Sequence, residues 1–191
     1  LKKKYSGRLD IRTGIELGLQ SHIADYLYKL TEEYPFDFVI GSVHFINGLD
    51  PYYPEYFEKH GKNSYRLYFE TLLRRIRKVK CYDSLGHLDY IVRYGAPHGL
   101  TYSYSEYDDY IDEILRQIIS DGKALECNTG GLSRGLTEPN PCRDVFVRYR
   151  ELGGELITLG SDADRCGAML RDCGFKYYAV YEKCRPEMLS L

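Results

Sequence analysis

The feature of this chain that most constrains its fold is a regular alternation of short apolar segments with amphipathic segments. The amphipathic segments repeat their apolar residues every three or four positions, as the buried face of a helix does. The apolar segments between them are rich in isoleucine, leucine and valine, as buried strands are. We expect strands over residues 8–17, 36–43, 82–92, 123–130, 155–163 and 174–181, and helices over residues 21–34, 64–79, 105–120 and 141–153.

This alternation predicts an α/β fold, in which parallel strands joined by helices form an open sheet or a closed barrel. The chain has 191 residues, a length that suits one hydrophobic core. No shift in composition and no long linker divides it, so we expect a single domain over residues 1–191. In folds of this class the ligand site gathers at the carboxyl ends of the strands.

Composition and charge argue against several classes of function. The net charge of −2 gives no reason to expect binding to nucleic acid. No apolar stretch approaches the roughly 20 residues that span a bilayer, and no signal peptide is visible, so we expect no membrane partner. The six cysteines form no Cys-x-x-Cys pair, which favours free thiols in a reducing cytoplasm. Nothing in the pattern indicates an oligomeric state.

Residues that can bind a metal stand where four of the expected strands end. Glu16 closes the first strand, His44 the second, His87 the third and Asp162 the fifth. These positions are far apart in sequence but converge on one small space if the strands are neighbours. Carboxylates and imidazoles without cysteine are typical ligands of Zn²⁺, Mn²⁺ or Fe²⁺. The placement therefore predicts a metal site.

Each of these residues alone also has a structural interpretation. Glu16 could be a paired core carboxylate, His87 a hydrogen-bonded core histidine, and Asp162 the N-cap of a helix. The same placement at four strand ends is much harder to explain by coincidence. Two metal ions that share a bridging glutamate can activate a water and bind a phosphoryl oxygen, a combination that suits hydrolysis of a phosphate ester.

The stretches GIELG, DFVIGSVHF, LGHLDYIVRYG, LECNTGGL and ITLGSDA carry a resemblance that covers residues 5–191. In this order they resemble the successive motifs of the PHP-domain histidinol-phosphatases, and the C-terminal GFKYYAVYEKCRPEMLSL is similar to the end of that family. The resemblance implies a distorted (β/α)7 barrel and a centre of two or three divalent metal ions, zinc, manganese or iron. It also implies hydrolysis of L-histidinol phosphate to L-histidinol and phosphate, a step of histidine biosynthesis.

The resemblance assigns roles to the residues already singled out. It implies that Glu16 is the bridging glutamate and that His44, His87 and Asp162 are further metal ligands, so these four would carry the catalysis.

The phosphate must also meet positive charge. Arg93 and Arg134 lie just past strand ends, and arginine can bind phosphate oxygens through two hydrogen bonds, although either could instead form a surface ion pair. Asn128 and His98 are weaker candidates for this contact.

The chain departs from the family pattern at two places. The family begins with a strand that carries His-x-His, and its second strand ends in another histidine, whereas this chain starts where the third strand would be. The family also has a ligand histidine after Gly-Ser-Asp-Ala, where this chain has Asp164. Asp164 is a poor replacement, and we expect a gap after Ala163.

Two explanations fit these departures, and three functions follow from them. Either the sequence omits segments of the natural protein, or the protein lacks them; we prefer the first, because a barrel without two strands exposes a long unpaired edge. The protein would then be an active histidinol-phosphatase. The alternatives are a PHP phosphoesterase for another small phosphomonoester, and a metal-poor, non-catalytic remnant that serves as a binding module.

Overall fold

The computed structural model describes residues 2–3, 5–8 and 10–162, without the side chain of Arg134. The expected strand over 174–181 and the expected gap after Ala163 lie outside the described residues. The strands are β1 (Gly14–Gly18), β2 (Phe38–Ser42), β3 (Ser84–Leu85), β4 (Ala124–Asn128) and β5 (Ile157–Gly160). The α-helices are α1 (Ala24–Glu33), α2 (Pro54–His60), α3 (Ser64–Lys78), α4 (Val92–Gly95), α5 (Asp108–Ser120) and α6 (Arg143–Glu151).

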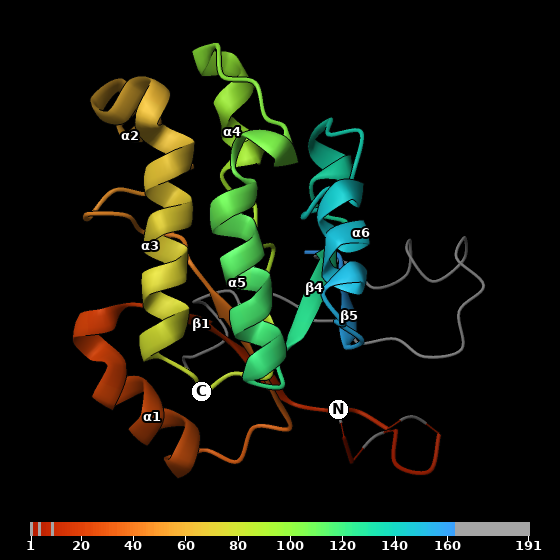
Figure 1. Cartoon of the computed structure of the whole chain (residues 1–191). Helices are drawn as coiled ribbons and strands as arrows, with labels where there is room; N and C mark the ends of the chain where they lie inside the picture. Colours follow the sequence, from red (N-terminus) through yellow and green to blue (C-terminus); the bar gives the residue numbers. More distant parts are fainter. Residues whose placement is uncertain (1, 4, 9, 163–191) are drawn as a thin grey trace.

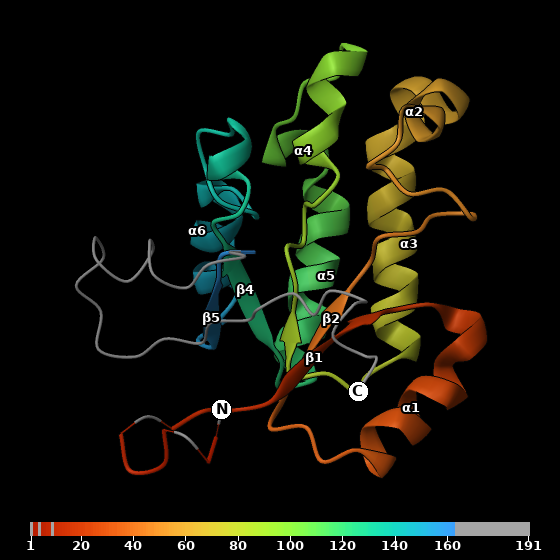
Figure 2. The same cartoon turned by 180° about the vertical axis from the view of Figure 1, so that it is seen from behind.

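The five strands form one parallel sheet whose spatial order is the order of the chain, from β1 to β5. Helices α3, α5 and α6 lie in front of this sheet in Figure 1 and behind it in Figure 2, so they cover one face. A doubly wound sheet reverses its strand order and carries helices on both faces. In a barrel wall, by contrast, each new strand is added on the same side of the previous one and the helices cover one face. The expected parallel α/β fold is confirmed.

The two faces of the sheet differ in chemistry because side chains alternate along each strand. Leu17, Val39, Leu85 and Leu125 belong to the core cluster that packs against the helices. The opposite face carries Glu16 and other polar side chains, and the buried ones among these are Ser42, Ser84, Glu126 and Asn128. The sheet therefore presents polar groups on the face that a barrel would enclose.

The sheet has two edges among the described residues, at β1 and β5. Among the described residues, strand β1 pairs with β2 on one side only. The described strands therefore form an open parallel sheet with one strand order, β1 to β5.

The core on the helical side is built from apolar residues that recur every three or four positions along the helices. Helix α3, expected over residues 64–79, buries Tyr65, Tyr68, Phe69, Leu72 and Ile76 at helical spacing. Helix α5 buries Ile111, Ile114, Leu115 and Ile118, while Tyr107 and Tyr110, also expected to face inward, are only partly buried. Each large apolar side chain that is fully buried contributes about 1.5–3 kcal/mol to folding. No helix in the described part of the chain is long and apolar enough to cross a membrane.

Two expected strands differ from the structure, and one helix was not expected. The first strand begins at Gly14, and the strand expected over 82–92 is only Ser84–Leu85. Leu88 and Ile91 are fully buried, but from turns, in which the amide of Tyr90 bonds to the carbonyl of His87. Burial in turns produced the apolar run that resembles a strand. Helix α2 was not expected from the sequence.

Candidate metal centre

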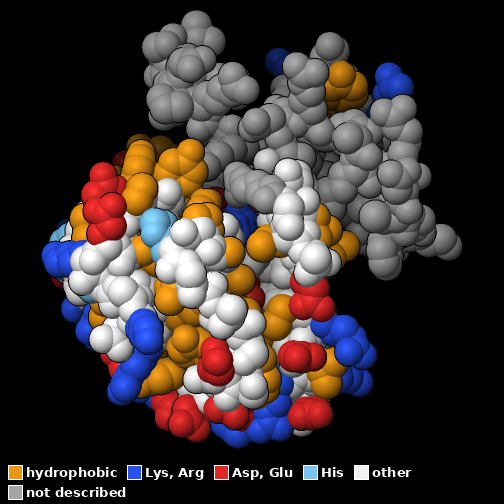
Figure 3. All heavy atoms as spheres, turned by 90° about the horizontal axis from the view of Figure 1, so that it is seen from above, with side chains coloured by type: hydrophobic (Ala, Val, Ile, Leu, Met, Phe, Trp, Pro, Cys, Tyr) orange, Lys and Arg blue, Asp and Glu red, His pale blue; other side chains and the backbone are white. Residues whose placement is uncertain are grey.

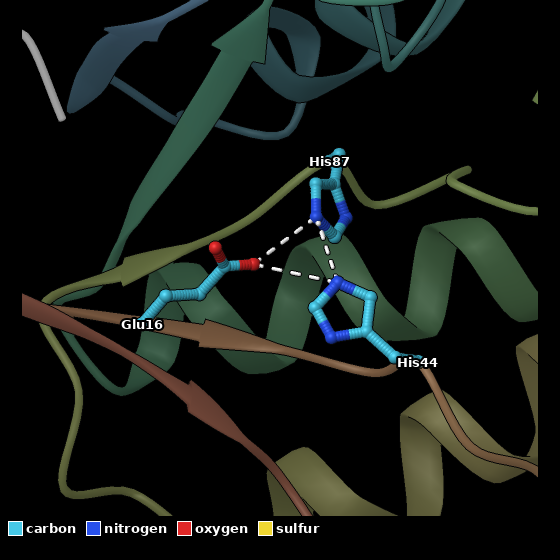
Figure 4. Close-up of side chains that lie close together, drawn as sticks. All are labelled: Glu16, His44 and His87. Carbon is cyan, nitrogen blue, oxygen red and sulfur yellow. Dashed lines mark hydrogen bonds and ion pairs between the residues drawn. The ribbon is translucent and has the colours of Figure 1, made fainter. Parts of the chain in front are cut away.

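Three of the predicted ligands come from three neighbouring strands. Glu16 lies in the middle of β1 and points from the polar face, while His44 and His87 each lie two residues past the ends of β2 and β3. Figure 4 shows the three side chains pointing toward one another from these separate segments. Glu16 is partly exposed, His44 is half-buried and His87 is buried.

The distances among the three side chains fit one metal ion. Oε1 of Glu16 lies 3.4 Å from Nε2 of His44 and 3.2 Å from Nε2 of His87. The two Nε2 atoms are 3.2 Å apart. Two atoms that bind one tetrahedral zinc at about 2.0–2.1 Å lie about 3.3 Å apart. The three atoms therefore have the spacing of three ligands around one zinc ion, which leaves a fourth position open.

The charges within this cluster favour a bound cation. Burial alone would raise the pKa of the Glu16 carboxyl, but the hydrogen bond from His87 and the charges of both imidazoles hold it well below its usual value. Burial alone would lower the pKa of His87, but Glu16 raises it. The carboxylate thus stays ionised and attracts positive charge, which a divalent cation supplies as well as a proton does.

Buried neighbours fix the backbone that carries each histidine. Val43 and Ile46 flank His44, and both are at most 1% exposed, so the segment is anchored on either side of the ring. The amide of His87 donates to Oε2 of Glu126 over 2.8 Å. Burial raises the pKa of the Glu126 carboxyl, which also accepts a hydrogen bond from Nδ2 of Asn128 over 3.3 Å.

Glycines allow the strands to approach this cluster closely. A Cβ atom at Gly86 would overlap Oγ of Ser42, and one at Gly160 would overlap Oε1 of Glu126. Both positions lie on the polar face of the sheet. Glycine here leaves the room that the Glu126 carboxylate needs beside β5.

Arg93, predicted as a phosphate contact, is the centre of a buried polar network. Its side chain, 2% exposed, donates from Nη1 to Oδ2 of Asp162 over 2.8 Å. Nη2 donates to Oδ1 of Asn128 over 2.8 Å, and Nε donates to Oδ1 of Asn140 over 2.7 Å. Asn140 is held in turn by Asp89, whose Oδ1 accepts from its Nδ2 over 2.7 Å. Burial raises the pKa of Asp89 to about 6.

Asp162 lies two residues past β5, in the same cleft, but it is not part of the three-residue cluster. Its Oδ1 accepts from Nδ2 of Asn128 over 2.9 Å. Burial alone would raise its pKa, but the bonds from Asn128 and Arg93 lower it. The carboxylate is therefore ionised.

The remaining predicted residues lie apart from the cluster or outside the described atoms. The backbone of Arg134 ends a 3-10 turn, Leu132–Arg134, but its side chain is outside the described part, as is Asp164. The ring of His98 stacks on Phe57, with ring centroids 4.5 Å apart, which gives it a packing role.

The three predicted ligands line one cleft of about 490 Å³ at the carboxyl ends of the strands, together with Arg93 and Asp162. Figure 3 looks onto this end of the molecule, where apolar side chains (orange) are exposed beside polar and charged ones. Sequence reasoning missed the aromatic part of the lining, Phe45, Tyr52, Tyr90 and Tyr94, together with Asp50 and the network residue Asn140. Phe45 and Tyr90 lie within three residues of the predicted ligands His44 and His87, so their position in the sequence could have indicated them. Nothing in the sequence near Asn140 indicates a role in the site.

Comparison with known families agrees with this geometry. Residues 1–130 match the sequence profile of the PHP domain. The chain belongs to the PHP domain family.

Curated relatives are similar over much of this PHP chain. A histidinol-phosphatase of Lactococcus lactis is 33% identical over 165 residues, which cover 85% of this chain and 61% of the relative. A probable histidinol-phosphatase of Clostridium acetobutylicum is 38% identical over 154 residues, which cover 78% of this chain and 59% of the relative. The chain therefore spans about three fifths of the length of these relatives.

Two solved structures have a similar fold. The crystal structure of histidinol phosphate phosphatase from Lactococcus lactis, complexed with zinc, L-histidinol and phosphate, aligns with a TM-score of 0.71 and 29% identity. The alignment covers 84% of this chain and 61% of that one. A Listeria monocytogenes structure aligns with a TM-score of 0.72 over 90% of this chain and 72% of its own, and at 22% identity it supports the fold alone.

Proposed function

We propose that the protein is a metal-dependent phosphomonoesterase that hydrolyses L-histidinol phosphate to L-histidinol and phosphate. The observation that carries the proposal is the convergence of Glu16, His44 and His87 at 3.2–3.4 Å in a PHP chain. Three protein ligands with an open fourth position are the arrangement of a catalytic rather than a structural metal site. The names of the relatives supply the substrate.

Glu16, His44 and His87 would hold one divalent ion, zinc, manganese or iron, and Asp162 would serve a further ion in the same cleft. A metal ion bound there lowers the pKa of water and neutralises charge on phosphoryl oxygens. The carboxylate of Glu16 keeps the ligand set anionic. Glu126 holds the backbone amide of His87, and so fixes the loop on which that ligand stands.

Arg93, Arg134 and Asn128 would bind the phosphate. Arg93 has five N–H donors, and three of them donate to other residues in the described part of the chain. The two donors without a partner among the described residues would bind phosphoryl oxygens, and the buried network presets the orientation of the guanidinium. Asn128 is already bonded to Arg93 and Asp162, so it would act mainly by orienting both.

The reaction replaces one P–O bond by another. The oxygen of water forms a bond to phosphorus while the bond from phosphorus to the alcohol oxygen breaks. One proton of the water is transferred to the alcohol oxygen, so the products are L-histidinol and inorganic phosphate. The phosphate-binding residues would hold the ester in place, and the carboxylate of Glu16 would keep the metal ligand set anionic.

We also propose that the protein works in a reducing cytoplasm. Cys81, Cys127 and Cys142 are free thiols, and burial raises the pKa of each, so none is a reactive thiolate.

Release of phosphate from L-histidinol phosphate tests the proposed function. The chain is loaded with Mn²⁺, Zn²⁺ or Fe²⁺ in turn and compared with Glu16→Gln and with the control Glu113→Gln, which changes an exposed carboxylate on α5. We expect the original chain to turn over the ester and Glu16→Gln to lose about 100-fold or more of that activity. The control Glu113→Gln should keep the activity of the original chain.

Two results would contradict the proposal. Turnover of other phosphomonoesters but not of L-histidinol phosphate would indicate a PHP phosphoesterase of different specificity. If the metal-loaded chain hydrolysed none of the esters, a non-catalytic binding module would be indicated.

A further inference from the structure

A continuous row of aromatic rings leads away from the metal ligands. The ring centroid of Tyr90 lies 5.0 Å from that of His44 and 4.9 Å from that of His87. Tyr94 follows at 5.2 Å from Tyr90, and Tyr52 follows at 5.5 Å from Tyr94. All these rings line the same cleft. We refer to Tyr52, Tyr90 and Tyr94 as the aromatic wall.

Asp50 adds a negative charge at the far end of this wall. It lines the cleft, and its Oδ1 accepts a hydrogen bond from the amide of Tyr52 over 2.8 Å. Among the described residues this is the one hydrogen bond that the carboxylate makes, and it forms no ion pair. The carboxylate is half-buried, so solvent screens it less than a fully exposed one.

A tight turn holds this carboxylate in place. Ile46 and Leu49 pair across the turn through both backbone hydrogen bonds, at 2.8 and 3.0 Å. Asn47 and Gly48 between them both have positive φ, the conformation that two-residue hairpin turns require. Ile46 is fully buried, so the segment from His44 to Asp50 is anchored at its middle.

The other carboxylates of the cleft are already engaged. Glu16 faces two imidazoles, Glu126 accepts from the backbone of His87, and Asp162 accepts from Arg93. A ligand with its phosphate at the metal cluster would extend its alcohol along the aromatic wall toward Asp50. Aromatic faces attract cations, and an accessible carboxylate forms charge-assisted hydrogen bonds with them.

We propose that Asp50 makes the site selective for phosphomonoesters whose alcohol carries a positive charge, with the aromatic wall as the surface along which that alcohol lies. This inference rests on the proposed function, since it takes the phosphate to bind at the metal cluster. Asp50 is then a specificity residue that contacts the leaving group and takes no part in breaking the P–O bond.

The test compares Asp50→Asn with the original chain on three substrates. L-histidinol phosphate offers a positive charge and a ring, ethanolamine phosphate a charge without a ring, and phenyl phosphate a ring without a charge. Asparagine keeps the oxygen that accepts from Tyr52, so the variant removes the charge and preserves the turn. Asp25→Asn, at an exposed position in the first turn of α1, is the matched control.

We expect Asp50→Asn to raise KM for both charged substrates on the order of tenfold and to leave kcat/KM for phenyl phosphate unchanged. Asp25→Asn should change none of these values. The affinity of the metal-loaded chain for L-histidinol, measured by calorimetry, should weaken by the same factor. This measurement tests the role of Asp50 even if the chain hydrolyses no ester. Unchanged melting temperatures of both variants show that they are folded.

The inference would be overturned if Asp50→Asn and the original chain had equal KM values and equal affinity for L-histidinol. It would also be overturned if kcat/KM for phenyl phosphate fell as much as it does for the charged substrates. The proposed function fails differently. A chain that hydrolyses ethanolamine and phenyl phosphates but not L-histidinol phosphate contradicts it, while a loss confined to the charged ester in Asp50→Asn still supports the role of Asp50.

Discussion

Glu126 shows at the scale of one residue how the candidate site is held together. The residue is 3% exposed, and its carboxylate accepts a hydrogen bond from the amide of His87 and occupies space that a side chain at Gly160 would fill. The sequence singled out Glu16, His44 and His87 because metal-ligating residue types at strand ends form a readable pattern. It gave no sign of Asn140, whose partners Arg93 and Asp89 come from distant segments.

Gly160→Ala tests this packing. The added Cβ overlaps Oε1 of Glu126, so the carboxylate must move and the bond to His87 weakens; we expect a destabilisation of about 1–3 kcal/mol. Gly18→Ala is the control, because a Cβ there meets nothing within 4 Å. Urea unfolding measures both variants, and equal stabilities would argue against close packing at Gly160.

Asn140→Ala tests the network around Arg93. The change leaves Nε of Arg93 and Oδ1 of Asp89 without their buried partner, so we expect a loss of about 2–4 kcal/mol in the free energy of unfolding. Asn63→Ala, at an exposed position whose side chain caps nothing, should cost far less. A cost below about 1 kcal/mol at Asn140 would mean that water replaces these hydrogen bonds.

At the scale of elements, helices with a clear apolar period were predictable and short elements were not. The stripe of α3 follows directly from its helical spacing. Helix α2 has seven residues, too few for a periodic pattern, although Pro54 at its first turn is a start signal. Strand β3 was predicted too long because Leu88 and Ile91 are buried from turns, and hydrophobicity alone does not distinguish these from a strand.

Helices α5 and α6 are joined by an ion pair whose effect depends on pH. Arg148 donates from Nη2 to Oδ2 of Asp112 over 2.6 Å and from Nε over 3.0 Å. The hydrogen bond from Arg148 lowers the pKa of Asp112 in the folded chain. The stabilisation is therefore complete above the unfolded pKa of about 3.9 and is lost as the pH falls through the lower folded value.

Asp112→Asn should accordingly destabilise the chain by about 1 kcal/mol at pH 7, the upper range for a partly exposed pair. The difference between the variant and the original chain should shrink steadily as the pH falls below about 4. Urea unfolding across this range measures it. A difference that stays constant down to pH 2 would show that the charge of Asp112 is not responsible.

At the scale of the whole molecule, the alternation of strands and helices predicted the parallel sheet, because each crossover helix returns the chain to the end of the sheet where the previous strand began. The position of the site followed from that topology, since the carboxyl ends of neighbouring strands converge. Sequence could not give the side-chain distances, or the engagement of Arg93 with Asp162 and two asparagines, because these depend on packing between remote segments.

Zinc titration, followed by calorimetry on the chain freed of metal, tests most directly whether Glu16, His44 and His87 form a metal site. At least one zinc ion per chain should bind, and His87→Ala should weaken that binding by about 100-fold or more. His22→Ala, which removes an exposed histidine near α1, should bind as the original chain does. Equal affinity in His87→Ala and the original chain, or no binding by either, would contradict the metal centre.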